Sequence, residues 1–314
     1  MKLAFILDPL EHLKPWKDSS VAMLRAAQAR GHETFAVMRP ALAWRAGAVR
    51  AACARLSLRD DRRDWFAAQA PREMALADFD AVLMRQDPPF DFEYLAATWL
   101  LERAAAGGAR VFNDPRAVRD HSEKLSILEF PQFIPDTLVA REPEALQAFI
   151  DEMGDAILKP VDGMGGAGVF RVARSDPNRN VIVETLTDNG AHTIVAQRFL
   201  PGIAQGDKRI LLIGGKVVPW ALARIPKPGE TRGNLATGGT GVAQPLTARD
   251  REIAEHLAPL LTARGILLAG IDVIGDCLTE INVTSPTCFV EIAQQSGFDV
   301  AGMFMDALER QCKA

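Results

Sequence analysis

The chain has few cysteines and no long hydrophobic run. Its four cysteines, in 314 residues, show no CxxC spacing, so neither a disulfide framework nor a cysteine-based zinc site is expected. No stretch of about 18 apolar residues is present that could cross a membrane. The apolar run from Leu3 to Leu7 meets Asp8 too early to form the core of a signal peptide. We therefore expect a cytoplasmic protein without a membrane partner.

An excess of positive charge is also missing. The formal net charge is −4 and the isoelectric point is about 5.8, whereas nucleic-acid binding requires a basic surface, so no nucleic-acid partner is expected. Hydrophobic residues make up 48% of the chain and charged residues 24%, which is typical of a globular protein. The length allows two or three packed units.

The sequence shows no pattern for a nucleophilic triad. The five histidines stand apart, without a serine or cysteine at a recognisable spacing: His12, His32, His121, His192 and His256. Each is more simply a structural or exposed residue, so covalent catalysis by a triad is not expected.

The first third of the chain alternates strand and helix patterns. Apolar runs predict strands at 2–7, 34–37, 80–84 and 110–112. Periodic segments predict helices at 21–30 and 93–106, the first preceded by Asp18-Ser19-Ser20 and closed by Gly31. This alternation predicts an open α/β sheet with parallel strands, in which ligands lie beyond the carboxyl ends of the strands.

After about residue 120 the pattern becomes that of a compact α+β unit. Short strands are predicted at 137–139, 156–159, 169–172 and 194–197, separated by helices at 143–153 and 179–189. Further elements follow: strands at 209–213 and 216–224, a glycine-rich loop at 229–241, a helix at 248–263, strands at 269–274 and 278–281, and a terminal helix at 298–311. No internal repeat is present.

Residues 163–168 contain four glycines, and Lys159 precedes them. Glycine lets the backbone turn its N–H groups toward an anion. The segment matches neither GxxxxGK[ST], in which lysine follows the last glycine, nor GxGxxG, which should open a helix. Two interpretations stay open at this point: a phosphate-binding flap between two strands, or an ordinary hairpin loop.

A second group of candidates consists of Asp272, Glu280 and Asn282. Glu280 and Asn282 are two apart on a predicted strand, so both side chains project to one face. Asp272 lies on the preceding predicted strand and could reach the same face. Carboxylate and amide oxygens are ligands of the kind that Mg²⁺ takes between phosphates. The alternative is a solvent-facing polar pair at a sheet edge.

Four arginines lie beside turns or glycine loops: Arg85, Arg209, Arg224 and Arg232. The guanidinium group is a planar, permanently charged fork suited to carboxylates and phosphates. For each arginine the alternative is a solvated surface residue. Arg209 and Arg224 fit that alternative least, because they lie in strands of alternating pattern.

Longer motifs extend along nearly the whole chain, at 84–91, 157–160, 162–166, 206–209, 222–226, 230–235 and 278–287. Together they resemble the bacterial glutathione synthetases of the ATP-grasp superfamily. The glycine loop and Glu280-x-Asn282 are shared by many ATP-grasp ligases. The runs Asp87-Pro-Pro-Phe-Asp91 and Asn282-Val-Thr-Ser-Pro-Thr287 are much more specific.

The resemblance implies an ATP-grasp fold of three units: an N-terminal open parallel-sheet domain (1–122), a central lid (123–200) and a C-terminal catalytic unit (201–314). It implies that ATP is bound by Lys124, Lys159, Gly163, Gly165, Gly166, Gln197, Leu200 and Asp207. Among these, Gln197 to Leu200 would border the adenine and Asp207 would bind the ribose. Magnesium, with manganese as an alternative, would be bound by Asp272, Glu280 and Asn282. Arg209 and Lys159 would be catalytic, and the substrate-binding residues would be Arg85, Arg224, Arg232 and Ser19.

The implied reaction is the ATP-dependent ligation of γ-glutamylcysteine and glycine to glutathione. It would pass through an acyl phosphate and release ADP and phosphate, in a homo-oligomer that we expect to be a homotetramer. Two other functions stay open. The chain could be another ATP-grasp carboxylate–amine ligase, or a non-catalytic nucleotide-binding module.

Overall fold

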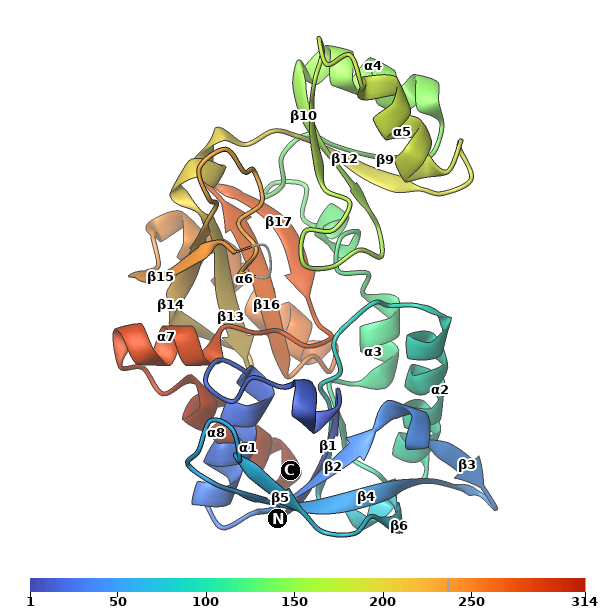
Figure 1. Ribbon diagram of the computed structural model, residues 1–314, viewed down its shortest axis with the longest axis vertical. Helices are drawn as coiled ribbons and strands as arrows, with labels where there is room; N and C mark the ends of the chain where they lie inside the picture. Colours follow the sequence, from blue (N-terminus) through green and yellow to red (C-terminus); the bar gives the residue numbers. More distant parts are fainter. Residues whose placement is uncertain (236–237, 314) are drawn as a thin grey trace.

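The computed structural model describes residues 1–235 and 238–313. Ala236 and Thr237, which belong to the predicted glycine-rich loop, lie outside the described residues. Within the described ranges the strands form three sheets, and helices pack on each of them. Figure 1 shows the sheets along the long axis of the molecule, with the N-terminal sheet at the bottom, the β9–β12 sheet at the top and the β13–β17 sheet between them.

The centre of the N-terminal sheet is parallel, as the alternating pattern predicted. β1 (Lys2–Leu7) lies between β2 (Glu33–Met38) and β7 (Ala81–Met84), and β8 (Val111–Phe112) continues the sheet beyond β7. Three helices accompany these strands: α1 (Ser19–Ala29), α2 (Phe92–Ala106) and α3 (Pro115–Asp120). Each begins after an aspartate, Asp18, Asp91 or Asp114, whose carboxylate accepts a hydrogen bond from the backbone N–H three residues later.

Antiparallel strands extend this sheet and were not predicted. They are β3 (Ala43–Arg45), β4 (Ala48–Leu58), β5 (Phe66–Ala68) and β6 (Arg72–Ala75). β4 pairs antiparallel with β2 and also with the three other strands of this group. Its buried and exposed positions alternate, but alanine occupies both faces, with Ala51 buried and Ala52 exposed. Residue type therefore marks the alternation only weakly.

The middle unit is an antiparallel sheet with two helices on it. Its order is β11 (Phe170–Ala173), β10 (Asp155–Pro160), β12 (Ile194–Arg198) and β9 (Thr137–Ala140). The helices are α4 (Pro143–Met153) and α5 (Arg179–Thr187). One cluster of buried side chains, including Leu146, Ile150 and Val183, lies entirely within this unit. The unit thus has a hydrophobic core of its own.

The third sheet has the order β15 (Thr240–Pro245), β14 (Lys216–Ile225), β13 (Asp207–Ile213), β16 (Leu268–Ile274) and β17 (Cys277–Asn282). Every neighbouring pair in it is antiparallel. Three helices follow its strands in sequence or pack on it: α6 (Ala248–Ala263), α7 (Phe289–Ser296) and α8 (Val300–Lys313). β15, which begins at the end of the predicted glycine loop (229–241), and α7 were not predicted.

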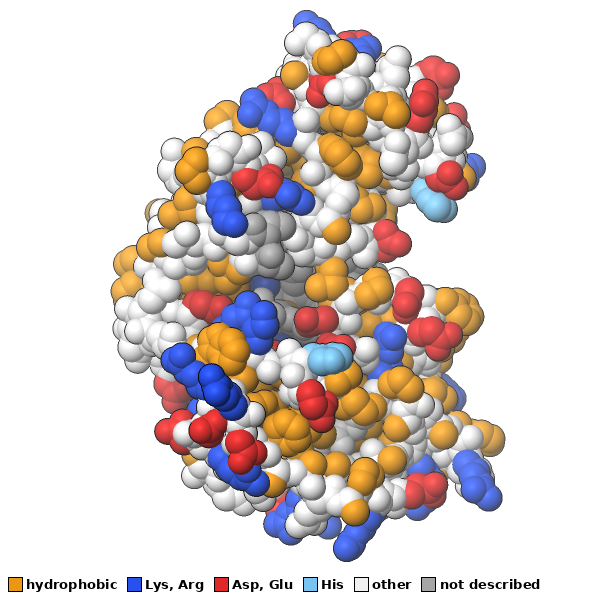
Figure 2. All heavy atoms as spheres, viewed as in Figure 1, with side chains coloured by type: hydrophobic (Ala, Val, Ile, Leu, Met, Phe, Trp, Pro, Cys, Tyr) orange, Lys and Arg blue, Asp and Glu red, His pale blue; other side chains and the backbone are white. Residues whose placement is uncertain are grey.

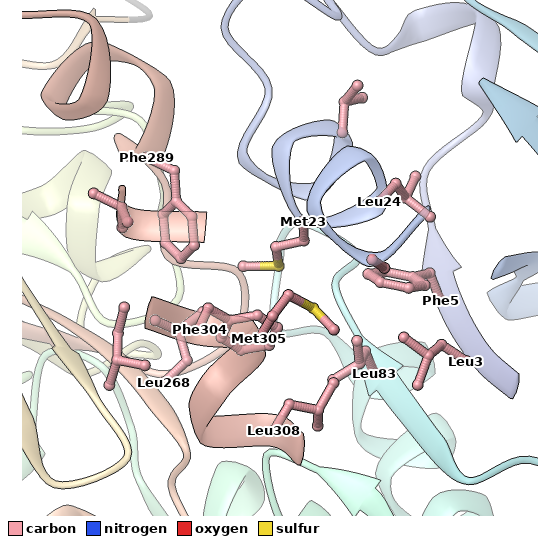
Figure 3. Close-up of a cluster of buried hydrophobic side chains, with 14 of the residues drawn as sticks. Leu3, Phe5, Met23, Leu24, Leu83, Leu268, Phe289, Phe304, Met305 and Leu308 are labelled. Atoms are coloured by element: carbon pink, nitrogen blue, oxygen red, sulfur yellow. The ribbon is translucent and has the colours of Figure 1, made fainter. Parts of the chain in front are cut away.

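One hydrophobic core joins the two ends of the chain. Figure 3 shows Phe5, Met23 and Leu83 of the N-terminal unit facing Phe304 and Met305 of α8. Arg30, after α1, adds an ion pair to Asp306 at 2.7 Å. The first and third sheets are therefore held together by buried apolar contacts, unlike the middle unit with its separate core. No helix among the described residues is long and apolar enough to span a membrane.

Candidate active site

A cavity of about 600 Å³ lies where the three units meet. Its wall includes Asp8 and Lys17 before α1, the glycine loop of the middle unit, and Asp272 and Glu280 of the third sheet. Figure 2 shows the molecule hollowed between the β9–β12 unit at the top and the N-terminal sheet at the bottom. Fourteen of the sixteen predicted site residues line this cavity, and the two that do not are Arg85 and Ser19.

The glycine loop connects the antiparallel strands β10 and β11, so it is both a hairpin loop and part of the cavity wall. Gly165 and Gly166 have φ of +61° and +84°, a region that favours glycine. A Cβ at Gly163 would lie 2.7 Å from Cγ of Pro160, and one at Gly166 would lie 2.7 Å from Oδ1 of Asn234. Larger residues would therefore displace the surrounding wall.

Two buried lysines lie below this loop. Nζ of Lys124 donates to the carbonyl of Gly163 and lies 3.2 Å from Oε1 of Glu280. Nζ of Lys159 donates to the carbonyl of Thr279 at 3.2 Å. Burial lowers the pKa of Lys159, and the neighbouring Glu280 carboxylate acts in the opposite direction. The two ammonium groups give this part of the cavity wall a positive charge suited to phosphate oxygens.

Asp272, Glu280 and Asn282 lie on two neighbouring strands, as their spacing predicted. In the antiparallel pair β16–β17, Asp272 is registered with Glu280, and Gly270 with Asn282. Nδ2 of Asn282 donates to the carbonyl of Gly270 at 3.1 Å and to Oδ2 of Asp272 at 3.3 Å. The group that Asn282 can offer to a cation is therefore its amide oxygen.

This donor set fits a magnesium ion held jointly with phosphate oxygens. No three His, Cys, Asp or Glu side chains of the described residues are grouped to hold a metal ion. The set instead offers two carboxylates and one amide oxygen beside Lys124 and Lys159. Magnesium takes hard oxygen ligands and usually combines one or two carboxylates with substrate phosphates.

Two arginines surround Asp272. Nη2 of Arg209 lies 3.0 Å from Oδ2 of Asp272, and Nη2 of Arg224 lies 2.9 Å from the same oxygen. Burial opposes ionisation of Asp272, but the two guanidinium charges hold the pKa of its carboxyl well below the usual range. Both arginines are buried, so the interpretation as solvated surface residues is wrong for them.

Asp207, the predicted ribose ligand, also pairs with Arg224. Burial raises the pKa of Asp207 to about 6, against the lowering effect of Arg224. Its Oδ1 is buried without a hydrogen-bond partner. An acceptor is therefore available there for a ligand hydroxyl group.

The predicted adenine border lies on β12 and just beyond it. Gln197 is registered with Ile157 of β10, and its Nε2 donates to Oγ1 of Thr137 at 3.1 Å. Leu200 and Ile203, which follow the strand, also line the cavity. This end of the cavity combines apolar walls with an amide group, as a nucleobase pocket requires.

Arg232 connects the two glycine-rich loops. Its Nη1 donates to the carbonyl of Gly166 at 3.3 Å, and its Nη2 lies 2.6 Å from Oε2 of Glu230. The segment around Arg232 thus contacts the 163–168 loop.

Arg85 and Ser19 lie behind the cavity wall. Nη2 of Arg85 donates to the carbonyl of Pro286 at 2.8 Å, and its Nε donates to Oγ of Ser20 at 3.1 Å. Oγ of Ser19 accepts from the backbone N–H of Phe289 at 3.2 Å. Both residues support the segment 285–289, of which residues 285–288 line the cavity. Their direct contact with substrate stays a prediction.

The lining residues that the sequence patterns missed include Glu123, Cys288 and Glu291. The Glu123 carboxylate accepts from the backbone N–H groups of Val283 and Thr284 at 2.9 and 3.0 Å. Burial, and then the charge of Glu280, raises the pKa of Glu123. Its position next to Lys124 was the available signal. Cys288 and Glu291 belong to the segment around α7, which the patterns did not predict.

Comparisons with known proteins agree with this architecture. The family model described as prokaryotic glutathione synthetase, N-terminal domain, matches residues 1–119, and the one described as prokaryotic glutathione synthetase, ATP-grasp domain, matches residues 123–297. Glutathione synthetase of Ralstonia nicotianae is 56% identical over 310 residues, with 99% of this chain and 96% of the relative covered. That of Nitrosomonas europaea is 58% identical over 314 residues, covering 99% and 98%.

Solved structures support the fold. D-cycloserine synthetase DcsG superposes with a TM-score of 0.69 at 16% identity, covering 99% of this chain and 100% of that chain. The ATP-grasp ligase PsnB, in complex with a minimal precursor, Mg and ADP, gives a TM-score of 0.63 at 19% identity, covering 100% and 98%. The chain has the ATP-grasp fold and belongs to the prokaryotic glutathione synthetase family of ATP-dependent ligases.

Proposed function

We propose that this enzyme joins γ-glutamylcysteine and glycine to form glutathione, with ATP cleaved to ADP and phosphate. Family membership over nearly the full chain supports this activity. The observation that carries the proposed mechanism is one cavity shared by the glycine loop, two lysines, two arginines and the Asp272–Glu280–Asn282 set.

The proposed nucleotide site runs along the middle and third sheets. Gln197 and Leu200 border the adenine, and the unpartnered Oδ1 of Asp207 accepts from a ribose hydroxyl. The phosphates lie between the loop glycines and the two lysines, whose charges offset theirs. The proposed magnesium ligands are Asp272, Glu280 and Asn282, and bound magnesium supplies Lewis-acid stabilisation of phosphate charge.

The chemistry requires a carboxylate to become an electrophile. An oxygen of the cysteinyl carboxylate attacks the γ-phosphorus, the bond to the β-phosphate oxygen breaks, and an acyl phosphate and ADP result. The glycine amine then attacks the acyl carbon, loses its proton, and expels phosphate. Lys159 and Arg209 offset the developing negative charge, which is a positioning and electrostatic task that needs no protein nucleophile.

The proposed substrate side uses the remaining arginines. Arg224 and Arg232 line the cavity and provide guanidinium groups for substrate carboxylates. Arg85 and Ser19, behind the wall, hold the segment 285–289 and act on the substrate through it.

We also propose the three-unit division 1–122, 123–200 and 201–314, with the middle unit acting as a lid. The separate core of the middle unit supports this division. An acyl phosphate is hydrolysed by water, so closure of the lid would protect it. A homotetramer in the cytoplasm, and manganese as an alternative ion, belong to the same proposal.

Release of ADP tests this function. With ATP and magnesium, γ-glutamylcysteine plus glycine should give rapid ADP release, whereas D-alanine or glutamate in place of the dipeptide should not. Rapid release with one of the replacements alone would favour another carboxylate–amine ligase. ATP binding without turnover on any pair would favour a non-catalytic nucleotide-binding module.

A further inference from the structure

Glu291 is a carboxylate of the cavity wall to which the proposed mechanism gives no role. It lies in the first turn of α7 and lines the cavity. Its Oε2 is buried and has no hydrogen-bond partner. A buried carboxylate oxygen without a donor is costly, so such a group in a binding site points to a donor supplied by a ligand.

The other carboxylates near this end of the cavity are already engaged. Asp18 accepts from the backbone N–H of Val21 at the start of α1, and Asp8 accepts from that of Asp87 at 3.0 Å. Asp87 itself accepts from the hydroxyl of Ser285. Asp207 also has an unpartnered oxygen, but its other oxygen pairs with Arg224. Since these other carboxylates already have partners, Glu291 is the candidate to bind a positively charged group of a ligand.

Glu291 lines the same cavity as Arg209 and Arg224 and the loop before α1. Cys288, one helical turn earlier, interacts electrostatically with Arg209 and Arg224 and also with Glu291. Lys17 and Asp18 also act on Glu291. Burial raises the pKa of Glu291, whereas a hydrogen bond from its own backbone N–H and then the Lys17 charge lower it. Glu291 therefore belongs to a stretch of the cavity wall on which Lys17 and Asp18 of the N-terminal unit and Cys288 of the third unit interact with the same carboxylate.

We infer that Glu291 binds the α-ammonium group of the γ-glutamyl residue. The inference rests on the proposed function, in which the cysteinyl carboxylate reacts beside Arg209. The other end of the dipeptide carries an ammonium and a carboxylate on one carbon. Glu291 and Lys17 both line the cavity and interact electrostatically, so they offer the complementary pair of charges.

The test compares wild type with Glu291→Gln, using γ-glutamylcysteine and N-glutarylcysteine, which lacks the α-amino group. For the variant we expect KM for γ-glutamylcysteine to rise about 10- to 100-fold. We expect kcat within threefold of wild type and unchanged KM for glycine and ATP. Wild type should use N-glutarylcysteine less well by a similar factor, and the variant should use both dipeptides about equally.

Three results would overturn the inference: an unchanged KM for γ-glutamylcysteine, a rise only in KM for glycine, or a variant that still discriminates against N-glutarylcysteine. Gln294→Ala, an exposed change on the same helix, is the control and should leave every KM unchanged. If Glu291→Gln does not fold, equal use of both dipeptides by wild type still contradicts the inference. Failure of wild type with γ-glutamylcysteine and glycine would instead contradict the proposed function.

Discussion

Arg209 and Asp272 lie directly opposite each other on the antiparallel strands β13 and β16 and form a doubly hydrogen-bonded ion pair. In the proposed mechanism Arg209 stabilises the transition state and Asp272 binds magnesium. Arg224 makes a second ion pair with Asp272, so its carboxylate is neutralised from two sides. In the proposed mechanism the pair therefore serves both the stability of the buried site and its chemistry.

Replacing Arg209 by methionine should reduce both stability and activity. The change leaves buried Asp272 with Arg224 as its remaining guanidinium partner, so we expect the free energy of unfolding to fall by about 3 kcal/mol. Loss of the proposed transition-state charge should reduce turnover by about 1000-fold. Urea unfolding and ADP release measure the two effects. Adding Asp272→Asn should restore at least half of the lost stability and no activity; a double variant as unstable as the single one would contradict the pairing.

Replacing Glu280 by alanine should remove activity with little effect on the fold. Glu280 faces the cavity beside Lys124, and the change deletes one proposed oxygen ligand without opening the hydrophobic core. We expect turnover to fall at least about 100-fold and the melting temperature to change by a few degrees at most. ADP release and thermal unfolding by circular dichroism check this. The matched control is Glu73→Ala, at an exposed position on β6. Wild-type turnover of the Glu280 variant would refute the metal role.

Replacing Gly166 by alanine should weaken ATP binding. The new Cβ would lie 2.7 Å from Oδ1 of Asn234, at a φ of +84°. We expect KM for ATP to rise about tenfold and stability to fall by about 1–2 kcal/mol. Gly31→Ala separates the two causes, because Gly31 has a φ of +76° and nothing within 4 Å of the added Cβ. The Gly31 variant should be less stable but should keep the wild-type KM for ATP. Equal KM values for ATP in the Gly31 and Gly166 variants would contradict a role of the 163–168 loop in ATP binding.

The raised pKa of Asp207 predicts that the stability of the protein depends on pH. Burial raises its pKa to about 6 in the folded protein, from an ordinary value of 3.8. The folded state thus binds more protons between these values, so Asp207 lowers stability as the pH rises from about 4 to about 6. Asp207→Asn should therefore gain on the order of 2–3 kcal/mol relative to wild type between pH 4 and pH 7.

Urea unfolding of wild type and Asp207→Asn at both pH values measures this difference. Asp60→Asn, at a fully exposed position, is the control and should show none. The prediction would be wrong if the free energy of unfolding of the wild type rose relative to that of the Asp207 variant from pH 4 to pH 7.

Local patterns predicted the parts of the site that depend on local geometry. The glycines at 163–168 need positive φ or close approach within a single loop, and Glu280 and Asn282 share a face because a strand alternates. The parallel strands β1, β2, β7 and β8 are short apolar runs bounded by turns, which is a strong local signal. Each of these features can be recognised within about ten residues.

The missed features depend on contacts between distant segments. Glu123 is fixed by Val283 and Thr284, about 160 positions away, and nothing near Glu123 indicates these partners. Arg85 was predicted to bind substrate, which stays a prediction; the sequence did not indicate its contacts with Ser20 and with the carbonyl of Pro286, 201 positions away. The roles of the substrate residues came from resemblance, because charge and spacing do not identify the acid that is activated.

Transfer of an isotope from substrate to phosphate tests the central claim most directly. γ-Glutamylcysteine carrying ¹⁸O in both oxygens of its cysteinyl carboxylate is incubated with the enzyme, ATP, magnesium and glycine, and the released phosphate is analysed by mass spectrometry. An acyl phosphate predicts one ¹⁸O atom in each phosphate and one in each glutathione amide. Glutathione formed with unlabelled phosphate, or with ¹⁸O in AMP, would contradict phosphoryl transfer to the carboxylate at this site.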